Sequence, residues 1–317
     1  MEEAFDKLFQ ERPHLKPRSR KLYRHNVDNM LRDQFSLDAD ITDISGNPDL
    51  VINYLDSCCE NTAKLTCTSV IALLKCNGCE NDTLMPFVRK HQELAGKLKE
   101  KADMQSTDKD FATLEEIRGV ETLLRRVVKQ KKLFCRDAAD DEERDLLQRL
   151  LLVRLYLKYP LRNEYSTLKI TNCPTDAKYT GNWICTRPYK IILNDYKTSN
   201  KYGHKEYELP PDISRLAARV VRSSQSGYLL NCKKCAASPI TGPYFNHYLS
   251  NIFMETINKR IGSSAIRKAH VTDMYKDAPS IAQKQALADI MNHKPETAEQ
   301  FYCKKHFTGI QESTNSA

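Results

Sequence analysis

The chain has 317 residues, of which 40% are hydrophobic and 28% charged, a globular balance that excludes wholesale disorder. Its apolar runs, such as Val70–Leu74, are too short to cross a bilayer, and residues 1–16 contain no secretory apolar stretch, so we expect an intracellular protein without membrane contact. Residues 1–105 carry 15 basic and 17 acidic side chains, whereas residues 106–317 carry 34 and 24. The excess of basic side chains in residues 106–317 favours nucleic acid as a partner, although many soluble domains carry a charge of this size.

Helical periodicity dominates residues 1–97 and predicts helices at about 16–35, 49–58, 62–75 and 83–98. The first of these contains the strongest basic cluster of this half, formed by Lys16, Arg18, Arg20, Lys21 and Arg24. Residues 98–110 are polar, a composition typical of interdomain linkers. We therefore predict a helical domain over 1–97, a linker over 98–110 and a second domain over 111–317.

The second domain is predicted to be mainly helical with a small antiparallel sheet, so the fold class is mainly α with an α+β second domain. Thr113 and Glu116 form a capping-box pattern, and a strongly apolar helix over 140–158 ends before Pro160. Two strand patterns, at 189–196 and 204–209, flank a turn-like segment and predict a β-hairpin. Further helices are predicted at about 211–222, 241–260, 264–275, 280–292 and 295–305.

The sequence has no P-loop, GxGxxG or HExxH motif. It therefore lacks the motifs by which P-loop nucleotide-binding proteins, dinucleotide-binding proteins and zincin metalloproteases are usually recognised. Two CxxC pairs, Cys76–Cys79 and Cys232–Cys235, lie much further apart than the pairs of a four-cysteine zinc site. The eleven cysteines are an odd number, and in a reducing compartment most are expected to be free thiols. We predict neither a metal nor another cofactor.

Five polar residues stand where predicted elements of the second domain begin or end: Arg162, Lys197, Arg267, His293 and Tyr302. Two arginines can grip phosphate oxygens in bidentate fashion, and a histidine can donate to the same charge or move a proton. A lysine can protonate a leaving oxygen, while a tyrosine hydroxyl can attack phosphorus. Together they would suit metal-free phosphoryl transfer, although each residue alone is more often structural.

The order and context of these residues resemble the tyrosine recombinases, also called the phage-integrase family, over nearly the whole chain. Arg162 in YPLRNEY matches the first arginine of that family, Lys197 the hairpin lysine, and Arg267 the second arginine. His293 in IMNH matches the Leu-Gly-His position, with Asn292 in place of glycine, and Tyr302 matches the nucleophile. The chain departs from the pattern at Ser264, where the family usually has histidine or lysine; His270 is a partial substitute to consider.

The resemblance implies a helical core-binding domain and a catalytic domain that clamp double-stranded DNA, with the basic cluster of residues 16–24 among the DNA contacts. It implies a site-specific recombinase or integrase that works through a 3′-phosphotyrosyl intermediate, as a homotetramer on two DNA sites, in the host nucleus or cytoplasm. The departures favour a viral or mobile-element source. Two alternatives stay open: a type IB topoisomerase-like nicking-rejoining enzyme, and an inactive DNA-binding protein that retains the fold.

Overall fold

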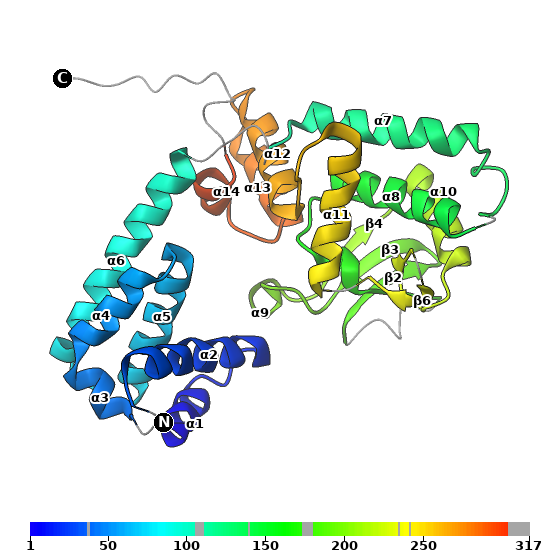
Figure 1. Ribbon diagram of the computed structural model, residues 1–317. Helices are drawn as coiled ribbons and strands as arrows, with labels where there is room; N and C mark the ends of the chain where they lie inside the picture. Colours follow the sequence, from blue (N-terminus) through cyan, green and yellow to red (C-terminus); the bar gives the residue numbers. More distant parts are fainter. Residues whose placement is uncertain are drawn as a thin grey trace, which may run out of the picture. The chain divides into compact units, whose positions relative to one another are not determined.

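The computed structural model describes residues 1–36, 39–104, 111–138, 140–172, 180–233, 235–240 and 242–303. The chain divides into two compact units, Met1–Gln105 and Ser106–Ala317 (Figure 1). Each unit has its own hydrophobic core. Within these described ranges no helix is both long enough and apolar enough to cross a membrane.

Unit 1 is a bundle of helices around α5. Its helices are α1 (Glu2–Glu11), α2 (Pro17–Gln34), α3 (Ile41–Gly46), α4 (Pro48–Ser57), α5 (Glu60–Cys76) and α6 (Asn81–Met104). Helix α5 buries Cys67, Val70 and Leu73 because it packs against α1, α2, α4 and α6. The four predicted helices are present, but α6 continues to Met104, so the first part of the segment predicted as a linker is helical. The rest of that segment, residues 105–110, lies outside the described residues.

Unit 2 surrounds a small sheet with helices. The helices are α7 (Leu114–Gln130), α8 (Asp141–Lys158), α9 (Ser199–Tyr202), α10 (Pro211–Ser223), α11 (Gly242–Ile257), α12 (Ser263–Tyr275), α13 (Ile281–Ile290) and α14 (Pro295–Phe301), with a 3-10 turn at Glu164–Thr167. The strands are β1 (Leu168–Thr171), β2 (Asn182–Thr186), β3 (Tyr189–Leu193) and β4 (Lys205–Glu208), with a second pair formed by β5 (Asn231–Cys232) and β6 (Cys235–Pro239). The predicted fold class, mainly helical with a small sheet, is confirmed.

The sheet itself corrects one expectation, because it is mixed and not wholly antiparallel. Its order is β1-β2-β3-β4, with β3 antiparallel to both neighbours but β1 parallel to β2. The predicted hairpin is the β3–β4 pair, and its connection contains the single turn α9. The free edge of β1 is covered: the amide of Ile170 donates to the carbonyl of Gly227 over 2.8 Å. The β5–β6 pair was not predicted, since β5 has only two residues and shows no periodicity.

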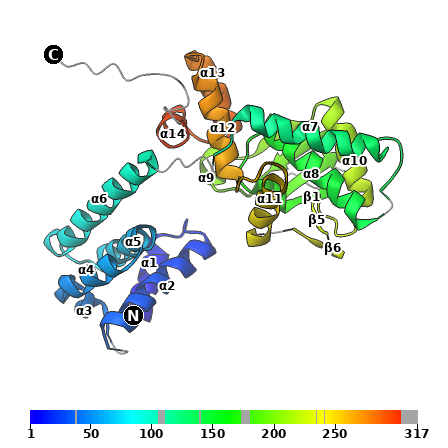
Figure 2. The same cartoon turned by 45° about the horizontal axis from the view of Figure 1, so that its top comes forward.

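Helix α8 is the centre of unit 2 and packs against α7 and α10 (Figure 2). Four consecutive residues, Leu150, Leu151, Leu152 and Val153, are all buried, so the middle of this helix is covered around most of its circumference. Helix α7 begins at the predicted capping box, in which the amide of Glu116 donates to the Thr113 hydroxyl over 3.1 Å. At the other end of the unit, Val271, Tyr275, Met291 and Ala298 form a small separate core that joins α12, α13 and α14.

Candidate active site

Three of the five predicted site residues meet at the small core of α12, α13 and α14. The guanidinium carbon of Arg267 lies 4.9 Å from the centroid of the Tyr302 ring. The rings of His293 and Tyr302 are stacked, with centroids 5.3 Å apart and an interplanar angle of 28°. The structure thus brings together residues that are separated by as many as 35 positions in the sequence.

Arg267 is held rigidly inside the protein. Only 1% of its surface is exposed, and it lies in the second turn of α12. Its Nη1 donates to the carbonyl of Pro160 over 2.7 Å, and its Nη2 donates to the carbonyl of Met291 over 3.1 Å. These two carbonyls follow α8 and α13 respectively, so the arginine connects the ends of both helices and its orientation is fixed.

Arg162 lies just after the break that Pro160 imposes at the end of α8. Its carbonyl accepts a hydrogen bond from the buried Tyr156 hydroxyl over 2.6 Å. The next residue, Asn163, donates to the Asn246 side chain on α11 and accepts from the Ser263 hydroxyl on α12, both over 2.8 Å. The segment that carries the first arginine is therefore attached to the helix that carries the second one.

His293 follows α13 in a turn whose backbone conformation suits the asparagine that precedes it. Asn292 has a φ of 53°, a left-handed conformation that asparagine tolerates better than most residues. Its side chain donates to the Tyr207 hydroxyl over 3.0 Å, and its carbonyl accepts from the Thr198 hydroxyl over 3.1 Å. Thr198 follows the exposed Lys197 in the β3–β4 connection, and Asn292 precedes His293. The hydrogen bond between Thr198 and Asn292 therefore attaches the segment that carries Lys197 to the turn that carries His293.

The charges of the cluster act on Tyr302. Burial alone would raise the pKa of Tyr302, but the charge and hydrogen bonding of Arg267, with the charges of Arg162 and Lys197, hold it below its ordinary value. Burial and the two arginine charges lower the pKa of His293 to about 4, so its imidazole is neutral at pH 7. The site therefore places a hydroxyl whose anion is stabilised beside a neutral imidazole, which still carries one N–H donor.

Several buried polar atoms of this cluster have no hydrogen-bond partner of ordinary geometry within the described residues. They are both ring nitrogens of His293, Nε of Arg267, one carboxylate oxygen of Glu164 and the side-chain oxygen of Asn292. Burial raises the pKa of Glu164, against the opposing charges of Arg162 and Arg267. Buried groups of this kind are seldom left unsatisfied, and so many on and beside Arg267 and His293 indicate a place for a polar ligand.

Two polar residues of α12, Ser264 and His270, take different roles in the structure. Ser264 is exposed in the first turn of α12. His270 contacts the carbonyl of Tyr156 through Nε2 over 3.0 Å, so that nitrogen holds α12 against α8. This contact argues against the expectation that His270 substitutes for a donor at position 264. Sequence reasoning also overlooked Asn163, although its polar type beside Arg162 was a usable signal.

The basic cluster of α2 divides into two groups. Arg20 donates to the carbonyls of Leu15 and Pro13, and Arg24 forms an ion pair with Glu2 over 2.7 Å. Both guanidiniums also lie over phenylalanine rings of α1, so these two arginines hold α1 against α2. Lys16, Arg18 and Lys21 are exposed.

The two CxxC pairs lie in different units, Cys76–Cys79 in unit 1 and Cys232–Cys235 in unit 2. Among the residues that the structure describes, no three histidine, cysteine or acidic side chains gather as a metal-ligand group.

No family model matches the chain. No curated protein matches it in sequence either. A solved structure described as the crystal structure of XerA recombinase is similar to the chain with a TM-score of 0.41 and 10% identity, over 98% of this chain and 95% of that one. The function is therefore inferred from the side chains of the site.

Two histidines, the half-buried His270 of α12 and the buried His293 after α13, predict that acid destabilises the fold. Burial lowers the pKa of His270 and of His293 to about 4, whereas both bind protons near pH 6.5 when unfolded. The free energy of unfolding is therefore expected to fall between pH 6.5 and 4, by at most about 3 kcal/mol for each histidine. Urea unfolding at several pH values measures this slope.

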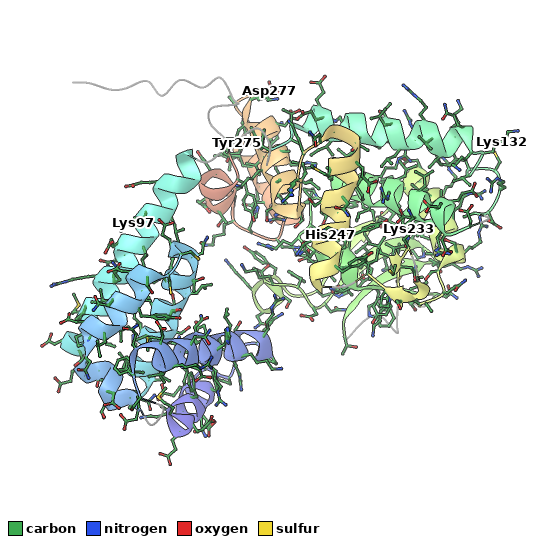
Figure 3. All side chains as sticks on the ribbon, in the orientation of Figure 1. Lys97, Lys132, Lys233, His247, Tyr275 and Asp277 are labelled. Carbon is green, nitrogen blue, oxygen red and sulfur yellow. The ribbon has the colours of Figure 1, made fainter. Side chains whose placement is uncertain are left out.

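His270→Gln should flatten that slope, because glutamine can still donate to the Tyr156 carbonyl but cannot be protonated. The matched control is His247→Gln on α11, an exposed histidine labelled in Figure 3. If the free energy of unfolding of His270→Gln depends on pH as steeply as that of the unchanged protein, then His270 is not a neutral histidine in the folded state.

Proposed function

We propose that the protein is a DNA strand transferase that cleaves and rejoins DNA through Tyr302, as a site-specific recombinase of the tyrosine type does. The observation that carries the proposal is the unsatisfied, positively charged surrounding of Tyr302. Arg267 and His293 contact the tyrosine ring, and Arg162 and Lys197 act on it electrostatically. A phosphodiester is the ligand that would satisfy two guanidiniums beside a nucleophilic hydroxyl.

In the proposed reaction the Tyr302 oxygen attacks phosphorus while its proton passes to water. Arg162, Arg267 and the N–H of the neutral His293 bind the transition state and stabilise the negative charge that gathers on the non-bridging oxygens. The 5′-oxygen leaves with a proton from Lys197, so that a 3′-phosphotyrosyl bond and a free 5′-hydroxyl result. The 5′-hydroxyl of a partner strand then reverses the reaction. On the recombinase reading, exchange takes place in a homotetramer on two DNA sites.

A second candidate, a DNA-binding protein without activity, is favoured by one observation. Ser264 is short and exposed where a histidine or lysine would donate to the phosphate, and the Nε2 of nearby His270 is engaged elsewhere. The loss of one donor is expected to slow phosphoryl transfer, whereas the nucleophile, both arginines and the lysine are retained. We therefore favour an active enzyme.

Covalent trapping tests the proposed function directly. The protein is incubated without metal with nicked duplexes that lose the cleaved fragment, taken from the flanks of its own gene, and then run on a denaturing gel. We expect a shifted band whose DNA-linked peptide contains Tyr302. Salt-sensitive duplex binding without any adduct would instead support the inactive DNA-binding protein.

Replacement of Lys197 should separate proton donation from the rest of the chemistry. Lys197→Ala is expected to lower the single-turnover cleavage rate by about a hundredfold, within the range usual for general acids. A 5′-bridging phosphorothioate should restore the rate, because a thiolate leaves without a proton. Lys201→Ala, in α9 of the same connection, is the control and should retain normal cleavage. If sulfur substitution does not help Lys197→Ala, the general acid is another group.

A further inference from the structure

A half-open cavity of about 560 Å³ lies along α10 and shares no residue with the candidate active site. Four guanidiniums line it, those of Arg215, Arg219 and Arg222 on α10 and that of Arg154 on α8. The only carboxylate in the lining is that of Asp212. We call this cavity the arginine groove; it carries a clear excess of positive charge.

The ion pairs within reach leave much of this charge available. Arg154 is bound to Glu121 over 2.7 Å and more loosely to Asp212 over 3.3 Å. Arg219 and Arg222 share one carboxylate, Asp137, at 3.5 Å each, and its side chain is 78% exposed. Long ion pairs with an exposed carboxylate contribute little to the free energy of folding. Another anion can therefore take the place of Asp137 beside Arg219 and Arg222 at small cost.

Arg215 has no hydrogen bond or ion pair within the part of the chain that the structure describes, and it is exposed. It precedes Arg219 by four residues and Arg222 by seven, so all three lie on one face of α10 over about 10 Å. Carboxylates two residues apart on an extended chain, or four apart on a helix, are spaced by about 6 Å and match this row.

The groove also has an apolar part. Phe134 lies beyond the end of α7, two residues after Lys132, which Figure 3 labels, and is 37% exposed. Leu216 and Ala218 also line the cavity. Duplex DNA keeps its bases stacked inside the helix, so it would offer phosphates to the arginines but no apolar group to Phe134. An acidic peptide with one large apolar residue offers both.

We propose that the arginine groove binds an acidic segment of a partner protein, with an apolar side chain of that segment against Phe134 and its carboxylates along the α10 arginines. This inference is independent of strand transfer at Tyr302, since no residue is shared. It predicts an accessory protein that associates with unit 2 through a strongly salt-dependent contact.

The test uses the full chain and fluorescein-labelled peptides that carry one Leu, Phe or Trp among Glu and Asp residues, measured by fluorescence anisotropy. Arg215→Glu should weaken peptide binding by at least about tenfold, whereas Lys129→Glu, an equal charge change at an exposed site of α7 outside the groove, should alter it by less than about twofold. Phe134→Ser, and peptides with serine in place of the apolar residue, should each weaken binding by about fivefold or more.

Duplex DNA titrated into the same variants distinguishes the two kinds of polyanion. The proposal requires that Arg215→Glu and Lys129→Glu bind duplex DNA equally well. It is overturned if none of the peptides binds, if both charge reversals weaken the peptides alike, or if serine peptides bind as tightly as the others. It is also overturned if Arg215→Glu loses affinity for DNA and not for the peptides, because the groove is then a nucleic-acid surface.

Discussion

Tyr302→Phe is expected to abolish the covalent DNA adduct and to leave DNA binding and folding nearly unchanged. Phenylalanine keeps the ring that stacks on His293 and lies beside the Arg267 guanidinium, so only the hydroxyl is lost. Without a nucleophile the single-turnover cleavage rate should fall by more than about a thousandfold, which corresponds to about 4 kcal/mol of activation free energy. The free energy of unfolding should change by less than about 1.5 kcal/mol.

Tyr275→Phe is the matched control. Tyr275 belongs to the same small core and its hydroxyl contacts Glu299 over 3.2 Å, so its loss costs stability on a similar scale. It lacks the contacts with Arg267 and His293, however, and adducts should form at the normal rate. An adduct that persists in Tyr302→Phe would show that another of the fifteen tyrosines is the nucleophile.

The helices of unit 2 were predictable because their signals are local. The apolar pattern of α8, its end before Pro160 and the capping box of Thr113 lie within a few residues of the structure they specify. The parallel pairing of β1 with β2 was not predictable in this way. The pairing depends on which strand lies beside β1 in the folded chain. The alternation of side chains along a strand of four residues does not determine whether its partner runs parallel or antiparallel.

In the candidate site, too, the sequence predicted the identity of the residues but not their tertiary contacts. The sequence marked Arg162, Arg267, His293 and Tyr302 as a set through their order, but no single-residue pattern predicted that Arg267 would be almost fully buried between two backbone carbonyls. Two of the five residues of the basic cluster, Arg20 and Arg24, hold α1 against α2, a role that charge alone could not reveal. Such roles depend on tertiary contacts, which the local sequence does not specify.

Arg267→Lys is expected to lower cleavage by about a hundredfold to a thousandfold, the range seen when one preorganised donor to a developing oxyanion is lost. Lysine keeps the charge but cannot donate to the carbonyls of Pro160 and Met291 while also reaching a phosphate oxygen. We also expect a loss of about 2–4 kcal/mol in the free energy of unfolding, since two buried charged hydrogen bonds are disturbed. Rates are therefore measured well below the unfolding temperature and normalised to the folded fraction.

The pKa of Tyr302 separates a lost transition-state contact from simple damage to the fold. Because Arg267 opposes the effect of burial, its replacement by methionine should raise that pKa above the ordinary value of tyrosine. This shift can be followed by NMR of tyrosine labelled at Cζ, with Tyr302→Phe to assign the signal. Arg149→Met is the matched control, because Arg149 is also a mostly buried, ion-paired arginine of unit 2 and has no contact with Tyr302. If both methionine variants slow cleavage alike and the Tyr302 pKa is unmoved in each, then Arg267 supports the fold alone and the positive surrounding of Tyr302 is not what activates it.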